Sequence, residues 1–63
     1  MKNDEYVGCL EYCGDVYQVI RRDQTLIAGT VFNVGMCELY SVSIDTTVDE
    51  ALSNLYDIII EDN

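Results

Sequence analysis

Catalysis is the first function that the sequence argues against. The chain has no histidine, its single lysine is Lys2, and no serine or cysteine has a basic partner that could activate it as a nucleophile. The four glycines stand singly, at spacings that match neither a dinucleotide-binding nor a triphosphate-binding loop. Paired carboxylates could hydrolyse glycosides, but that reaction needs a substrate cleft, which 63 residues scarcely have the core to form. We therefore expect a protein that is not an enzyme.

The three cysteines, Cys9, Cys13 and Cys37, are the remaining candidates for redox or metal chemistry. An odd number cannot pair completely, and disulfide-stapled domains are usually denser in cysteine, so we expect free thiols. Structural zinc takes four cysteine or histidine ligands, which this chain does not supply. The sequence predicts no metal and no cofactor, and it favours the cysteines as small, buried or half-buried apolar side chains.

Acidic residues raise the separate question of calcium. Asp45, Asp49 and Glu50 lie close together in the sequence. The alternating ligands and the central glycine of an EF-hand loop are absent around them. We expect incidental weak binding there at most.

The balance of charge decides which partners are electrostatically favourable. Twelve Asp and Glu residues stand against three Lys and Arg residues, so the formal net charge is −9 at pH 7 and the isoelectric point is about 4.1. Such a chain repels nucleic-acid phosphates and anionic lipid headgroups, and it attracts basic surfaces. We expect a basic protein partner and no direct contact with nucleic acid or membrane.

Length and hydropathy indicate one small folded domain, residues 1–63. Apolar residues make up 49% of the chain and the mean hydropathy is +0.06, which does not fit a disordered segment. The N-terminus lacks the features of a secretory signal, and no apolar run approaches the roughly 20 residues that span a bilayer. We expect a cytoplasmic protein.

The first elements that the sequence predicts, and that must position the acidic residues, are strands. Residues 6–44 are rich in Val, Ile, Thr and Tyr, and short polar clusters interrupt them. Ser41 and Ser43 alternate with apolar neighbours, which indicates a sheet with one buried face. Short connections between successive strands favour antiparallel neighbours. We predict a meander of three or four strands, at residues 6–12, 16–20, 25–34 and 36–44.

Turn signals separate these strands. Gly14, within residues 13–15, can take the positive φ of a tight hairpin. Residues 21–24 form the second predicted turn and residues 33–35 the third. Gly29 is a candidate bulge or bend inside the third strand.

The hydrophobic period changes after Ile44, and a helix should follow. Thr47 and Glu50 fit a capping box, in which the Thr47 hydroxyl accepts from the Glu50 amide while the Glu50 carboxylate accepts from the Thr47 amide. Apolar residues then recur at three- and four-residue steps, on the side expected to pack on the sheet: Val48, Ala51, Leu52, Leu55, Tyr56 and Ile59. The three isoleucines at residues 58–60 also suit a strand, which leaves open a helix that ends near Tyr56; we favour the longer helix. The fold class is therefore α+β, a small antiparallel β-meander packed by one C-terminal α-helix.

The predicted helix carries acidic residues near both of its ends, where the helix dipole acts on them in opposite ways. Asp49 and Glu50 lie in the first turn, where the helix dipole favours negative charge. Asp57, Glu61 and Asp62 lie near the C-terminal end, where the dipole disfavours it, and the helix has no basic residue. One interpretation is a solvated face that keeps the protein soluble. The other is a face that binds a basic partner, because carboxylates on a rigid element can contact the same Arg and Lys side chains as a phosphate backbone.

Tyr6, Tyr12 and Tyr17 all fall on the predicted first hairpin. Tyrosine is common at interfaces because its ring packs while its hydroxyl stays in water. The alternative is that the three rings complete a thin core and its rim.

In size, charge and lack of catalytic residues, the chain resembles the small acidic single-domain inhibitors that phages and mobile elements encode, such as DNA-mimicking antirestriction and anti-CRISPR proteins. The resemblance implies an inhibitor of a basic, nucleic-acid-binding protein. The second hypothesis is a small homo-oligomeric structural or accessory subunit, for instance a homodimer, because a second copy could complete so thin a core. We predict a non-catalytic protein-binding module with these candidate partner-binding residues: Asp49, Glu50, Asp57, Glu61, Asp62, Tyr6, Tyr12 and Tyr17.

Overall fold

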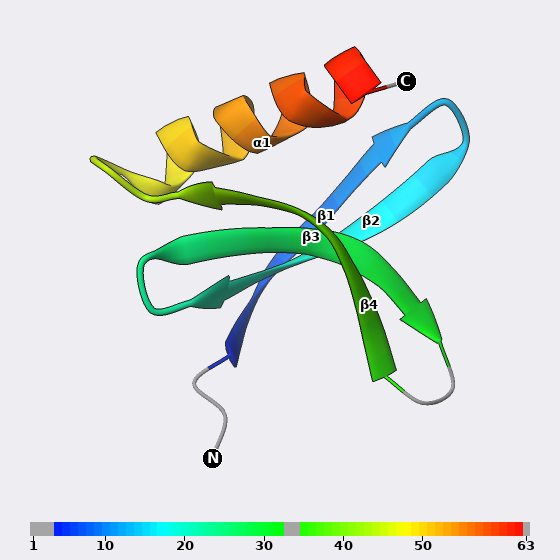
Figure 1. Cartoon of the computed structure of the whole chain (residues 1–63), viewed down its shortest axis with the longest axis horizontal. Coiled ribbons are helices and arrows are strands. Elements are labelled where there is room, and N and C mark those ends of the chain that lie inside the picture. Colours follow the sequence, from blue (N-terminus) through cyan, green and yellow to red (C-terminus); the bar gives the residue numbers. More distant parts are fainter. Residues whose placement is uncertain (1–3, 33–34, 63) are drawn as a thin grey trace.

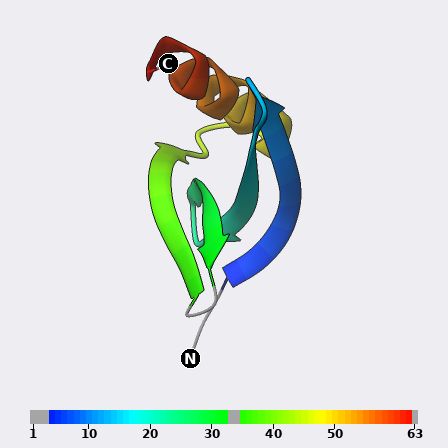
Figure 2. The ribbon, with the colours of Figure 1, turned by 90° about the vertical axis from the view of Figure 1, so that its right-hand side faces the viewer.

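A computed structural model describes residues 4–32 and 35–62 of the chain. Four strands form one antiparallel sheet in the order β1-β2-β3-β4, and a C-terminal helix packs on it (Figure 1). Figure 2 shows that the sheet is curved and that the helix lies on one side of it. The elements are β1 (Asp4–Tyr12), β2 (Asp15–Arg22), β3 (Thr25–Phe32), β4 (Gly35–Ser43) and α1 (Val48–Asp62). The predicted α+β meander with one C-terminal helix is confirmed.

The second hairpin differs from the sequence prediction. Arg21 and Arg22 belong to β2 and not to a turn, because Arg22 has strand partners on both sides, Asp4 in β1 and Thr25 in β3. The loop therefore needs only residues 23 and 24, and Asp23 takes a positive φ of 56°. In the third predicted turn, residues 33 and 34 lie outside the described residues.

The first hairpin is as predicted, with Gly14 in its turn. Tyr12 and Asp15 pair across the strands, which leaves a two-residue loop. Cys13 and Gly14 have φ values of 54° and 84°. Positive φ at both central residues is the geometry that suits the twist of a two-residue hairpin.

Gly29 lies at the irregular point of the β3–β4 pairing. Ala28 pairs with Tyr40 and Gly29 with Glu38, so the extra residue of the bulge is Leu39, on β4. A Cβ atom built on Gly29 would overlap the Cys37 carbonyl oxygen and lie 2.9 Å from its carbonyl carbon. The predicted irregularity at Gly29 is confirmed, and its cause is the close approach of the β4 backbone.

The core lies between the helix and the facing side of the sheet. The helix buries Ala51, Leu55 and Ile59, one row at four-residue spacing. Partly buried apolar side chains, Val48 and Leu52 among them, pack around this core. The helix continues through residues 58–60 because Ile59 belongs to that row, which confirms the longer helix. The sheet contributes the other buried members of the cluster, Tyr17, Val19, Leu26 and Ala28.

The start of the helix confirms half of the predicted capping box. The Glu50 amide donates to the Thr47 hydroxyl at 3.1 Å. The Glu50 carboxylate, however, accepts from the hydroxyl of Thr46 and not from the Thr47 amide. Both interactions still hold Glu50 in the first turn, where the helix dipole stabilises its negative charge.

The prediction of buried cysteines is wrong, although all three thiols are free. Cys9 lies on edge strand β1, where the period of two directs Leu10 to the helix side and Cys9 to the other. Cys13 lies in the hairpin loop and Cys37 on edge strand β4. All three side chains are therefore exposed.

Replacing Gly29 by alanine should destabilise the sheet, because the added methyl group meets backbone that must shift. We expect a loss of about 1–3 kcal/mol, typical of overpacking. Gly8→Ala is the matched control, since a Cβ atom at Gly8 meets nothing within 4 Å. Urea unfolding of both variants tests this. Equal stabilities for the two variants would show that the approach to Cys37 is not a constraint.

Candidate protein-binding surface

The outward side of α1 carries three exposed carboxylates in line. Glu50, Asp57 and Glu61, together with Asn54, are spaced so that they share the side opposite Leu55. We call Glu50, Asp57 and Glu61 the helix stripe. The rise of a helix separates the first two by about 10 Å along the axis and the last two by about 6 Å. Asp49 is also exposed and adds a fourth charge at the start of the helix.

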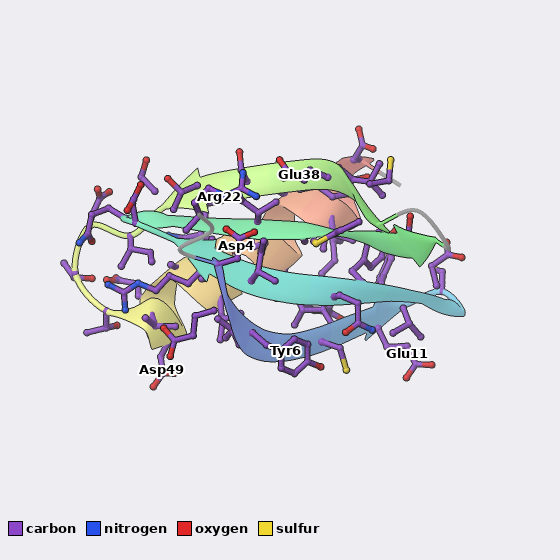
Figure 3. The ribbon with its side chains drawn as sticks, turned by 90° about the horizontal axis from the view of Figure 1, so that it is seen from below. Asp4, Tyr6, Glu11, Arg22, Glu38 and Asp49 are labelled. Atoms are coloured by element: carbon purple, nitrogen blue, oxygen red, sulfur yellow. The ribbon has the colours of Figure 1, made fainter. Side chains whose placement is uncertain are left out.

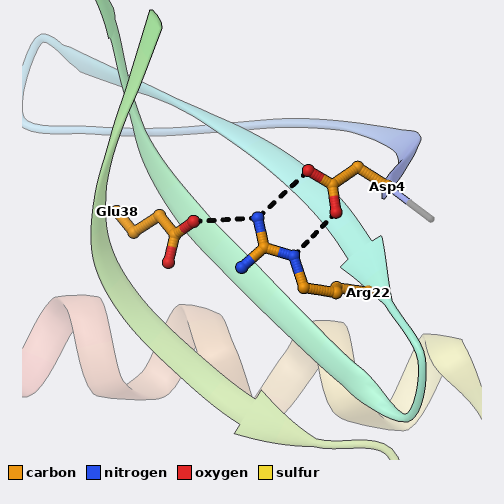
Figure 4. Close-up of polar contacts among 3 residues, drawn as sticks. All are labelled: Asp4, Arg22 and Glu38. Atoms are coloured by element: carbon orange, nitrogen blue, oxygen red, sulfur yellow. Dashed lines mark hydrogen bonds and ion pairs between the residues drawn. The ribbon is translucent and has the colours of Figure 1, made fainter. Parts of the chain in front are cut away.

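The basic side chains of the sheet do not compensate this stripe. Arg22 donates to both carboxylate oxygens of Asp4, at 2.7 and 3.0 Å, and to Glu38 at 2.9 Å (Figure 4). These hydrogen bonds raise the pKa of the Arg22 guanidinium further above its usual value. Arg21 donates instead to the backbone carbonyl of Asp23, at 3.1 Å.

Residues 4–32 and 35–62 hold all twelve acidic residues of the chain. Two of these carboxylates pair with Arg22, and the other ten form no salt bridge with a described residue. The whole helix stripe belongs to those ten. Its charge is therefore available to a partner.

Asp62 differs from the stripe, because it has a local partner that the sequence did not reveal. The Tyr40 hydroxyl, from β4, donates to Asp62 Oδ2 at 2.6 Å. This hydrogen bond, together with partial burial and the nearby carboxylate charge, raises the pKa of Tyr40 to about 12. Asp62 thus has a structural role, because its hydrogen bond connects the last turn of the helix to the sheet.

The three candidate tyrosines do not form one surface. Tyr17 is buried in the core and meets the Tyr40 ring edge-to-face, with centroids 5.9 Å apart. Tyr12 is half-buried and meets the Tyr56 ring at 6.1 Å. These two rings pack within the protein, as the structural interpretation of the tyrosines predicted.

Tyr6 alone is strongly exposed, at 65%. A bulge at Val7, between the pairs Tyr6–Ile20 and Gly8–Val19, breaks the period of two in β1. Tyr6 therefore shares a side with Ile20, away from the helix, while Tyr12 faces the helix. Figure 3, which looks from below with the sheet in front of the helix, shows Tyr6 on β1. The candidate residues thus lie on two opposite faces of the molecule.

A hollow at the start of the helix includes Asp45 and Glu50, two of the three acidic residues that raise the question of calcium, but not Asp49. It encloses about 270 Å³ and is lined by Asp45, Glu50 and polar neighbours from residues 43–54. Across the described residues, no group of three or more His, Cys, Asp or Glu side chains is placed to hold a metal ion. Within the same residues, the helix is too short and too polar to cross a membrane.

Comparison of the chain with protein-family models, with curated proteins and with solved structures gives no match.

The link between Tyr40 and Asp62 predicts a loss of stability at alkaline pH. The pKa of Tyr40 is about 12 in the folded protein and about 10 in an unfolded chain. The unfolded state therefore releases this proton first, so the stabilisation is complete below pH 10 and is lost as the pH rises through 12. Tyr40→Phe should be less stable than the parent at pH 8 and should lose less stability between pH 9 and 11.

Thermal unfolding at several pH values measures this difference. The pKa of Tyr12 is also raised, chiefly by its hydrogen bond with Cys13, so the parent and the variant share that contribution. Tyr6→Phe, on the other face of the sheet, is the control and should follow the parent. Parallel curves for the parent and Tyr40→Phe would show that the hydrogen bond with Asp62 is not a stabilising link.

Proposed function

We propose that this chain is a non-catalytic protein-binding module whose helix stripe binds a basic protein surface. The observation that carries the proposal is the exposure of Glu50, Asp57 and Glu61 along one side of α1, with no salt bridge to a described cation. A nucleic-acid-binding protein is the partner class that best fits three carboxylates in line, because its basic groove already accepts a row of phosphates. Binding there would exclude the nucleic acid, so we propose an inhibitor of the kind that phages and mobile elements encode.

The rigidity of the helix supports this function. Leu55 and Ile59 are fully buried under the stripe, so the carboxylates extend from a backbone that is fixed before binding. Fixed carboxylates lose less conformational entropy when they form charge-assisted hydrogen bonds with Lys or Arg. Individual exposed ion pairs contribute only about 0–1 kcal/mol. Affinity must therefore come from several pairs together, and it should depend strongly on salt.

Two carboxylates of the helix stripe destabilise the helix, and this also supports a basic partner. Asp57 and Glu61 are like charges at i and i+4, near the end of the helix where the dipole disfavours them. The Asp62 side chain has Tyr40 as a partner, and Glu50 has Thr46 and the dipole of the first turn. The side chains of Asp57 and Glu61 form no hydrogen bond or salt bridge with a described residue. A basic partner would supply the missing compensation.

A charge reversal at Asp57 and Glu61 separates binding from stability. The double variant Asp57→Lys, Glu61→Lys should be as stable as the parent or more stable by a few tenths of a kcal/mol. The substitutions remove the acidic i, i+4 pair and replace negative charge by positive charge at the end of the helix where the dipole favours it. Its affinity for the partner should fall at least about tenfold, the equivalent of 1.4 kcal/mol. Glu5→Lys, Asp15→Lys is the matched control: it changes the net charge equally, at exposed positions on β1 and β2.

The partner is first captured from a cell lysate at low salt, identified, purified and measured by calorimetry. We expect a basic protein whose binding competes with DNA or RNA and weakens steeply between about 50 and 500 mM salt. Retained affinity in a well-folded Asp57→Lys, Glu61→Lys variant would contradict the role of the helix stripe. An acidic partner, or one whose affinity ignores salt, would contradict the proposed function as a whole.

A further inference from the structure

The open edge of β4 is a regular and uncharged stretch of strand. β4 is the last strand of the sheet, and within the described residues it pairs with β3 alone (Figure 1). Its bulge at Leu39 leaves residues 40–43 in unbroken register with β3. Those four residues are Tyr, Ser, Val and Ser. Charged side chains, prolines and bulges normally protect a sheet edge, and residues 40–43 have none of them.

The hydrogen-bond pattern identifies the backbone groups that this edge presents. The amide of Ile44 donates to the Gln24 carbonyl at 2.8 Å, just beyond the last pair of the β3–β4 ladder. Antiparallel pairs alternate between hydrogen-bonded and non-hydrogen-bonded, so Ser43 and Ser41 belong to non-hydrogen-bonded pairs and Val42 to a hydrogen-bonded one. The N–H and C=O groups of Ser41 and Ser43 therefore point away from β3, toward the open edge.

A hollow lies beside this edge, between the end of β4 and the first half of α1. It is the hollow of about 270 Å³ at the start of the helix: Ser43 lines it from the strand, and Ala51 and Asn54 line it from the helix. Asp45 and Glu50 give it two carboxylates, and its lining includes no lysine or arginine. Neither carboxylate forms a salt bridge with a described residue. An extended chain along β4 would therefore find backbone partners at the edge and acidic side chains beside it.

The opposite edge of the sheet is less suitable for an added strand. β1 is interrupted by its bulge at Val7, and Gly8 follows directly. A bulge breaks the row of backbone groups that an incoming strand needs, and a glycine inside a strand weakens it. The regular edge with a hollow beside it is that of β4.

A second copy of the chain is disfavoured as the added strand. Two β4 edges paired about a two-fold axis at Val42 would bring Glu38 of one copy close to Asp45 of the other. Like charges opposite each other destabilise strand pairing. Each copy also has a net charge of −9. Charge complementarity therefore favours a positively charged segment of another protein.

We propose that the β4 edge takes an extended basic segment of the partner protein as an additional strand of the sheet. The backbone of the segment would pair with Ser41 and Ser43, and its Lys or Arg side chains would meet Asp45 and Glu50 in the hollow. In this mode of recognition, main-chain hydrogen bonds give affinity and alternate side chains give specificity. The proposal rests on the proposed function for the basic character of the partner. Glu50 belongs to both surfaces, so the β4 edge and the helix stripe are continuous.

Two synthetic peptides test the edge by NMR titration of the isotope-labelled chain. Both have the same sequence, in which lysine alternates with valine and threonine. One has an ordinary backbone. In the other every backbone amide is methylated, which removes the donors and keeps the charge. The first peptide should shift the amide signals of residues 40–44, and the second should not. Equal binding of both peptides, or shifts centred on β1, would overturn the proposal.

Hydrogen exchange of the parent chain gives a second readout that needs no variant. The amides of Ser41 and Ser43 should exchange fast in the free protein and slowly in the complex with the unmethylated peptide. The Val42 amide, which bonds within the sheet, should be protected in both states. Unchanged exchange at Ser41 and Ser43 in the complex would show that no strand is added there, and would overturn the proposal.

Ser41→Pro removes one of the amide donors that point away from β3. Proline is tolerated on edge strands where the N–H faces solvent, so the variant should keep the fold, as circular dichroism and amide spectra will show. Its affinity for the unmethylated peptide should fall at least about tenfold. Ser41→Ala, which keeps the amide, is the matched control and should bind like the parent. Unchanged affinity in folded Ser41→Pro, or an equal loss in Ser41→Ala, would contradict pairing at this edge.

Failure of the edge and failure of the helix stripe have different signatures. Asp57→Lys, Glu61→Lys should still protect the Ser41 and Ser43 amides when the peptide is added, although it loses the partner captured from the lysate. If that partner binds Ser41→Pro as tightly as the parent, the edge proposal is wrong and the helix stripe stands. The unliganded chain should sediment as a monomer. A dimer that Ser41→Pro dissociates would assign the edge to self-association and overturn the basic segment.

Discussion

One helix is the only cover for the sheet in the described part of the chain, and the other features follow from this constraint. A protein of this length buries only about 60% of the surface that its unfolded chain exposes. The core is a single layer in which Leu55 and Ile59 meet Val19 and Leu26, all fully buried. Within residues 4–32 and 35–62, no further element covers the outside of the helix or the far side of the sheet. Both surfaces must therefore be solvated or bound by a partner.

Five of the twelve carboxylates have a local explanation. The helix dipole stabilises Asp49 and Glu50 in the first turn. Asp62 accepts a hydrogen bond from Tyr40, and Arg22 forms salt bridges with Asp4 and Glu38 across the sheet. Asp57 and Glu61 lack any such explanation within the described residues. Among the acidic residues of the helix, the two without a local explanation are therefore neighbours on one exposed face.

Local patterns were sufficient to predict the elements, and long-range contacts explain what was missed. The period of two, Gly14, Gly29 and the Thr47 cap predicted the strands and the helix because each acts over a few residues. The bulge at Val7 was not predicted, although Gly8 beside it is the same kind of signal as Gly29. This bulge turns Tyr6 away from Tyr12 and divides the predicted tyrosine cluster. The hydrogen bond of Tyr40 with Asp62 joins residues 22 positions apart and depends on the packing of the helix.

The central claim is that most of the negative charge is not compensated within the fold. The dependence of unfolding on sodium chloride tests it most directly, because salt screens repulsion among exposed charges over a Debye length that shrinks from about 30 Å at 10 mM to about 3 Å at 1 M. If the carboxylates repel one another, the melting temperature should rise by several degrees over this range, most steeply at low salt. A melting temperature that stays constant or falls would show that the charges are already compensated, and would contradict the account.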